Sequence, residues 1–293
     1  MKNKCVRRLK TRCVEEDIRG YEQHKRFLGI RERSISENSE RIRKVLKLTD
    51  KHIYKWSNRD ALYIYYRIYK IPVNASKNKL LRGIDGKEIV DIGEKYKLRT
   101  ISDETAKKYI QSIKSFTNWL VQSNRINKNP FIGLIPKRTK VKKELKRHKY
   151  DQSQINKIFS DELFFNEDFF NSHKYWIPIL AIELGMRQNE IAQLYKRDIT
   201  LVDDIWCLSI NDDSDDKSVK NEYSVRLIPL TKNIIRLGFI SFISNKNDRL
   251  FTELNYGRAG YATSVTKWYS YKSNKWGFGK KTYVSFVQAL LYR

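Results

Sequence analysis

The chain has 293 residues, enough for two domains, and its 59 Lys and Arg outnumber its 33 Asp and Glu to give a formal net charge of +26. This excess favours a polyanion such as nucleic acid as a partner, whereas 40% hydrophobic and 13% aromatic residues exclude a disordered basic tail. The three cysteines and four histidines lack the spacings of a disulfide framework or a metal site. The sequence shows neither a long apolar run nor a signal peptide, which predicts an intracellular protein with no membrane partner.

Residues 1–30 are interpreted as a basic N-terminal arm with few apolar anchors. Six lysines and arginines fall at its start, namely Lys2, Lys4, Arg7, Arg8, Lys10 and Arg12. A solvated tail and an arm that lies along DNA phosphates both fit this composition.

Residues 31–135 predict a helical domain. Cap-type residues followed by an apolar stripe indicate a first helix after Ser34, and residues 58–67 indicate another. Residues 73–98 are polar and mixed, which predicts a long loop with a short helix near residues 86–96.

A well-marked helix follows Ser102, which suits an N-cap because acidic residues then occupy the positive first turn. Apolar residues recur every three or four positions, which predicts a core-facing helix that is stopped at Asn129 and Pro130. The outward positions include Lys107, Lys108 and Lys114. A basic outer face serves solubility in many helices, but here it matches the charge of the whole chain, and we interpret these lysines as DNA-binding.

Residues 136–149 mark a domain boundary, because they have little to bury and carry eight Lys and Arg. An inert tether and a strap that follows DNA phosphates are the alternatives, and we favour the strap. Each phosphate that it neutralises would add about 0.9 to the salt dependence of binding. The candidate DNA-binding residues of this linker are Lys137, Arg138, Lys140, Lys142, Lys143, Lys146 and Arg147.

A second domain, residues 150–293, opens with a capped helix over residues 150–159. Residues 176–184 are almost wholly apolar and predict a helix that is buried on most sides. Pro178 suits the first turn of that helix, and Gly185 suits its C-terminus, where a left-handed residue is often needed.

Arg187 follows at a sharp junction with a shorter second helix. The aliphatic part of its side chain is expected in the core and its guanidinium at the protein surface. This arrangement suits a bidentate contact to a phosphate. A structural arginine that pairs with Glu190 or caps a carbonyl fits the stretch equally well, because buried arginines are usually paired.

Residues 205–210 and 223–230 predict the two strands of a hairpin. The loop between them, residues 211–222, is polar and acidic. Its aspartates lack the ligand spacing and the sixth-position glycine of an EF-hand, which argues against a metal site; they are Asp212, Asp213, Asp215 and Asp216.

The pattern Gly-x-Arg-x-x-Glu-Ile-x-x-Leu begins at Gly185 and is followed by Asp198 and Ile199. It resembles the first catalytic box of the tyrosine recombinase (phage integrase) family. In that family the arginine grips the scissile phosphate and the glutamate supports the site, so the resemblance implies these roles for Arg187 and Glu190.

The resemblance also implies a catalytic lysine near the second strand of the hairpin. Lys220 precedes Pro229 by a span typical of the family's lysine, which donates a proton to the leaving 5′ oxygen. Lys217, or neither lysine, is the alternative, because a lysine in a polar loop is usually only solvated.

A further set of residues resembles the helical core-binding domain of the same family: Ser102, Thr105, Tyr109, Ile110, Trp119, Leu120, Val121, Asn129, Pro130 and Phe131. The resemblance implies a mainly α fold with a small β-sheet (α+β). A SAM-like core-binding domain would precede a tyrosine recombinase catalytic domain that is incomplete at its C-terminus. It also implies double-stranded DNA and further protomers of a tetrameric synapse as partners, no cofactor, no metal, and a prokaryotic, cytoplasmic, nucleoid-associated location.

The pattern breaks at the family's second box, His-x-x-Arg. Its lead-in is present as Lys281 and Thr282, but the positions for histidine, arginine and a second histidine hold Val284, Val287 and Gln288. The family's nucleophilic tyrosine would lie beyond Arg293. Tyr283 and Tyr292 are both too close to the position of the missing second box to serve as that tyrosine. We hypothesise a frameshift or a truncated gene.

Two functions follow from this break. By descent the chain resembles a recombinase, but without a nucleophile no covalent intermediate forms, so a non-catalytic protein that occupies recombination sites or regulates a full-length partner is expected. The third interpretation is a generic nucleic-acid adaptor, which predicts no special role for Arg187.

Overall fold

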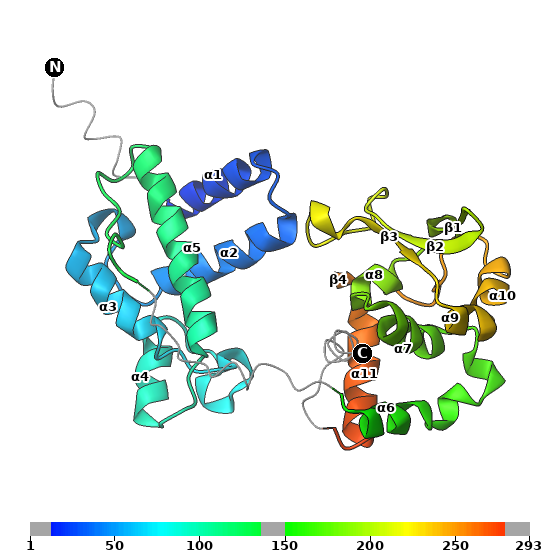
Figure 1. Ribbon diagram of the computed structural model, residues 1–293. Coiled ribbons are helices and arrows are strands. Elements are labelled where there is room, and N and C mark those ends of the chain that lie inside the picture. The colour runs from blue at the N-terminus through cyan, green and yellow to red at the C-terminus, as the bar shows by residue number, and fades with distance from the viewer. Residues whose placement is uncertain (1–12, 136–149, 279–293) are drawn as a thin grey trace. The chain divides into compact units, whose positions relative to one another are not determined.

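The computed structural model describes residues 13–135 and 150–278, and the chain divides into two compact units, Met1–Lys140 and Val141–Arg293 (Figure 1). Three predicted features therefore lie outside the described residues: the basic residues 1–12, the linker 136–149 and residues 284–288, where the family's second box would fall. In the part that is described, no helix is long and apolar enough to cross a membrane.

The first unit is helical. Its α-helices are α1 (Val14–Phe27), α2 (Glu32–Leu46), α3 (Asn58–Ile68), α4 (Lys87–Lys95) and α5 (Asp103–Gln122). It also contains the short 3-10 helices η2 (Ile53–Lys55), η3 (Ala75–Lys77) and η4 (Lys79–Leu81). Ser102 caps α5 by accepting from the amide of Thr105, which confirms the predicted start of that helix.

The core of the first unit forms around α5, which packs against α1, α2 and α3 (Figure 1). The periodic apolar residues of α5 are buried, as the spacing predicted: Ala106, Ile110, Ile113, Phe116 and Leu120. Burying such a stripe removes apolar surface from water, which is the main favourable term in folding.

Two predicted boundaries in the first unit were wrong. Residues 14–27 belong to α1 rather than to an arm, because Ile18 and Tyr21 supply the buried anchors that the composition hid. Helix α5 ends at Gln122 instead of running to Asn129, because Asn124 adopts a left-handed backbone (φ 54°) that ends the helical turn. Asn129 is instead buried, where its Oδ1 accepts from Thr117 Oγ1 at 2.8 Å.

The second unit combines helices with a small sheet. Its helices are α6 (Gln152–Phe159), α7 (His173–Leu184), α8 (Gln188–Ala192), α9 (Lys232–Arg236), α10 (Phe239–Ser244) and α11 (Ala262–Lys275). The short 3-10 helices of this unit are η6 (Glu162–Phe164), η7 (Glu167–Phe169), η8 (Lys196–Asp198) and η9 (Glu222–Ser224). The strands are β1 (Ile199–Val202), β2 (Ile205–Ile210), β3 (Arg226–Pro229) and β4 (Arg258–Tyr261).

Strands β1, β2 and β3 form an antiparallel sheet in that order, with Leu208 opposite both Ile199 and Ile228. The hairpin of β2 and β3 was predicted, although its second strand is shorter than expected. Together with the helices, the sheet confirms the predicted α+β class.

Helix α7 lies in the core of the second unit, where Trp176, Ile177 and Leu180 are fully buried. The predicted place of Pro178 was wrong: α7 begins at His173, so the proline lies inside the helix rather than in its first turn. The core packing of this apolar helix offsets the backbone hydrogen bond that an interior proline removes.

Candidate anion-binding site

The junction between α7 and α8 places Arg187 as predicted. Gly185 ends α7 in the left-handed region (φ 64°), and Arg187 is the N-cap of α8. Met186 beside it is fully buried, whereas the Arg187 side chain is 50% exposed. The fold therefore anchors the chain at the buried Met186 and leaves the Arg187 side chain at the surface.

Glu190 is the buried partner of this guanidinium. The Glu190 side chain is only 3% exposed, and its Oε1 lies 2.5 Å from Arg187 Nη1. Its Oε2 accepts from the backbone N–H of Arg187 at 2.9 Å. Burial raises the pKa of the Glu190 carboxyl, but hydrogen bonds from Arg187 and Arg226 outweigh burial and lower the pKa overall, so the carboxylate is ionised near neutral pH.

A second arginine, which sequence reasoning missed, shares the same carboxylate. Arg226 at the start of β3 places Nη2 3.1 Å from Glu190 Oε2, and its Nη1 donates to the carbonyl of Ser224 at 2.9 Å. The hydroxyl of Ser224 lies 3.3 Å from Arg187 Nη1. The only sequence signal for Arg226 is one charged residue within an otherwise apolar strand.

The two candidate lysines have opposite environments. Lys217 is buried, with Nζ 2.6 Å from Asp198 Oδ1 and 2.8 Å from Asp213 Oδ1. Lys220 is exposed and forms no ion pair within residues 13–135 and 150–278. No contact in that part of the chain joins either lysine to Arg187 or Glu190.

The acidic loop between β2 and β3 is held by internal contacts. Lys217 lowers the pKa of Asp213 by hydrogen bonding to its carboxylate. Asp216 Oδ2 accepts from the hydroxyls of both Tyr195 and Tyr261 at 2.5 Å. Burial raises the pKa of Asp216, but these two hydrogen bonds lower it overall. No cluster of metal-ligating side chains occurs among the residues that the structure describes.

The predicted DNA-binding lysines of α5 lie on an open surface. Lys107 and Lys108 are exposed, Lys114 is half-buried, and none of the three forms an ion pair within the described part of the chain. On α2, by contrast, acidic residues neutralise the basic ones, as in the pair Lys44–Glu40 at 2.8 Å. The linker candidates, Lys137 to Arg147, lie outside the described residues.

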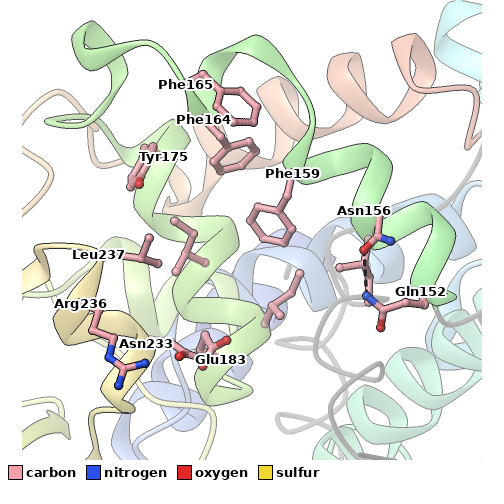
Figure 2. Close-up of a pocket in the computed structure, with 13 residues that line it drawn as sticks. Gln152, Asn156, Phe159, Phe164, Phe165, Tyr175, Glu183, Asn233, Arg236 and Leu237 are labelled. Carbon is pink, nitrogen blue, oxygen red and sulfur yellow. Dashed lines mark hydrogen bonds between the residues drawn. The ribbon is translucent and has the colours of Figure 1, made fainter.

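A cavity of about 550 Å³ lies elsewhere in the second unit, between α6, α7 and α9 (Figure 2). Aromatic rings such as Phe159 and Phe164 line one end, and Glu183 and Arg236 lie at the other (Figure 2). Arg187 does not line this cavity, so the cavity is separate from the candidate site.

No protein-family model and no curated protein sequence matches this chain. Solved structures do. The lambda integrase tetramer bound to a Holliday junction is 12% identical, with a TM-score of 0.63 over 99% of this chain and 76% of that one. The Tn1549 transposon integrase in complex with a circular intermediate DNA is 15% identical, with a TM-score of 0.60 over 94% and 84%.

A lambda integrase dimer bound to a COC′ core site gives a TM-score of 0.60 at 12% identity, over 94% of this chain and 88% of that one. At such low identity the similarity concerns the fold, and it extends across both units. This chain has the fold of the tyrosine recombinases and integrases.

Proposed function

We propose that this chain binds double-stranded DNA as a protein of the integrase and recombinase class, with Arg187 on a backbone phosphate. One observation carries this proposal: the guanidinium of Arg187 is half exposed, while the carboxylate that orients it is buried and ionised. The Tn1549 and lambda integrases that share this fold were solved in complex with DNA, which supports the same ligand.

Arg187 suits a phosphate because a guanidinium presents five N–H donors in a rigid fork. Its Nη1 is engaged by Glu190 and Ser224, whereas Nε and Nη2 have no acceptor within the described residues. These donors can bind a ligand while Nη1 keeps its contact to Glu190. The buried carboxylate thus fixes the rotamer, and the remaining donors bind.

The basic residues outside this site would extend the contact along the duplex. Lys107, Lys108 and Lys114 on α5 have no acidic partner in the described residues, and the linker Lys137–Arg147 region adds seven further candidates. Each lysine or arginine that neutralises a phosphate adds about 0.9 to the dependence of log K on log salt. Oligomerisation on DNA and a nucleoid-associated location in a prokaryotic cell belong to the same proposal.

We further propose that the chain does not cleave DNA alone. The family's second box supplies an arginine and a histidine to the reacting phosphate, but this sequence has Val287 and Val284 at those positions. Each missing electrostatic donor costs about 10²–10³ in rate. Lys220, which is exposed, remains the candidate proton donor, but it would have no strand cleavage to assist. Occupying recombination sites or regulating a catalytic partner is then the remaining function.

The first test is binding of the purified full chain to a random-sequence duplex across a salt series, with a nicked suicide duplex included to trap a covalent adduct. We expect steep salt dependence and no adduct. Arg187→Gln should lower the salt slope by about 0.9, as expected for one lost phosphate contact.

The matched control is Arg236→Gln, which removes the same charge from an exposed position on α9. Its slope should remain that of the unchanged chain. No binding at low salt would contradict the proposed function. A slope that Arg187→Gln leaves unchanged would favour a generic basic adaptor, and a covalent adduct would contradict the inactivity.

A further inference from the structure

We infer that Arg226 is a second phosphate-binding arginine, and that Arg187 and Arg226 together form a two-guanidinium site for a DNA phosphodiester. This inference rests on the proposed function and adds a residue to the same site. The two side chains come from separate segments, the N-cap of α8 and the first residue of β3, and meet at Glu190.

The contacts place both guanidiniums on one carboxylate. Arg187 Nη1 lies 2.5 Å from Oε1 of Glu190, and Arg226 Nη2 lies 3.1 Å from Oε2. Ser224 joins the same group, because its hydroxyl contacts Arg187 and its carbonyl accepts from Arg226. Two guanidiniums that share one carboxylate are necessarily close neighbours.

The charges of this group do not balance. Two guanidiniums carry two positive charges, since arginine stays protonated in proteins, and the one carboxylate of Glu190 neutralises only one of them. No other carboxylate contacts Arg187 or Arg226 in the part of the chain that the structure describes. The surplus of one positive charge matches the single negative charge of a phosphodiester, which would also relieve the repulsion between the two arginines.

Both guanidiniums are accessible to such a ligand. The Arg187 side chain is 50% exposed and the Arg226 side chain 35% exposed, so neither is enclosed by the core. Arg226 also retains an Nε–H for which the described residues provide no acceptor. A bridging phosphate could therefore accept from both side chains while Glu190 keeps its own contacts.

Arg249 shows how a structural arginine differs in this unit. Its guanidinium lies 3.4 Å from the ring centroid of Tyr261, and its Nη1 and Nη2 donate to the carbonyls of Leu254 and Phe251 at 3.1 Å. Its guanidinium therefore donates to backbone carbonyls and packs on an aromatic ring. Arg226 has one carbonyl contact and shares the carboxylate of Glu190 with Arg187. It therefore keeps accessible N–H donors for a ligand, which Arg249 does not.

The test separates direct binding from a role that acts through Glu190. In a Glu190→Gln, Arg187→Gln background, Arg226 has neither a carboxylate to hold nor an arginine to position, and no buried carboxylate is left unpaired. Adding Arg226→Gln to this background should still lower the salt slope for a random-sequence duplex by about 0.9. Arg236→Gln in the same background is the matched control and should leave the slope unchanged.

A second measurement uses the unchanged full chain and does not depend on how the variants fold. The guanidinium Nε–H resonance of Arg226, assigned by its loss in Arg226→Lys, should shift when inorganic phosphate is added to ¹⁵N-labelled protein. An unchanged slope together with an unmoved resonance would overturn the inference, even if Arg187→Gln weakens DNA binding. Failure of the unchanged chain to bind DNA would instead overturn the proposed function.

Discussion

Two clusters of charged side chains in the second unit each set a cation against a buried carboxylate, but they balance charge differently. Around Glu190, two half-exposed guanidiniums share one carboxylate. Around Lys217, one ammonium, 2% exposed, contacts the carboxylates of Asp198 and Asp213. Arg197 lies 3.8 Å from Asp213 and 3.7 Å from Asp248, so the three aspartates of this cluster outnumber its two cations.

The difference indicates which cation can act on a ligand. An ammonium has three donors, and Lys217 uses them on Asp198, Asn211 and Asp213 at 2.6 to 2.8 Å. It has none left for a phosphate or for a leaving oxygen. Arg187 has free donors and solvent access. Of the two lysines that the sequence left open, only Lys220 could therefore contact DNA without first breaking buried ion pairs.

The largest effect is expected from Lys217→Met. This substitution leaves the carboxylate of Asp198, itself 2% exposed, without its cation, and breaking a buried ion pair in this way costs about 3–5 kcal/mol. Lys220→Met, at an exposed position three residues along the chain, should change the free energy of unfolding by no more than about 0.5 kcal/mol. Urea denaturation of the full chain, followed by tryptophan fluorescence, measures both.

Equal and small losses for the two lysine variants would break the comparison. They would mean that water, admitted by a rearranged loop, solvates Asp198 in the variant, and that the contacts of Lys217 do not hold this cluster rigidly. Lys217 would then be available to a ligand after all.

The second effect comes from Glu190→Gln, which removes the carboxylate that the two guanidiniums share. Because glutamine keeps the shape, the expected loss near neutral pH is that of charge-assisted hydrogen bonds, about 1.5–3 kcal/mol. DNA binding should survive, since the positive charge of the site rises.

The pH dependence of this loss provides its control. The pKa of Glu190 is lower in the folded chain than in the unfolded one. Its ionised form therefore stabilises the fold above the unfolded pKa of about 4.3, and this contribution disappears as the pH falls through the folded pKa. The stability difference between the unchanged chain and Glu190→Gln should vanish in acid. A difference that is constant with pH would show that packing, not charge, is what the substitution removed.

The sequence could predict those parts of the site that depend on neighbouring residues. Gly185 ends a helix because a left-handed residue is needed there, and this local requirement places Arg187 and Glu190 one helical turn apart. The periodic apolar residues of α5 predicted its buried face for the same reason. These features follow from backbone geometry over a few residues.

The rest depends on contacts between distant segments. Arg226 reaches Glu190 across 36 positions, and Lys217 reaches Asp198 across 19. Nothing local distinguishes a lysine that folds inward from Lys220, which stays in solvent. The sequence therefore suggested Lys220 but could not show that Lys217 is occupied, and it gave no role to Arg226.

The smallest effects of single substitutions are expected at the two arginines, and they test the comparison at the Glu190 cluster. Arg187→Gln or Arg226→Gln alone should each change the free energy of unfolding by no more than about 1 kcal/mol, because both side chains are half exposed and water screens their ion pairs. Each single substitution also relieves repulsion between the two guanidiniums, and the remaining arginine still pairs with Glu190.

The double substitution removes both partners of a carboxylate that is 3% exposed, so its cost should exceed the sum of the two single costs and approach about 3–5 kcal/mol. Urea denaturation of the three variants measures this excess. Additive costs would mean that the two arginines do not share Glu190 as one charge-coupled group.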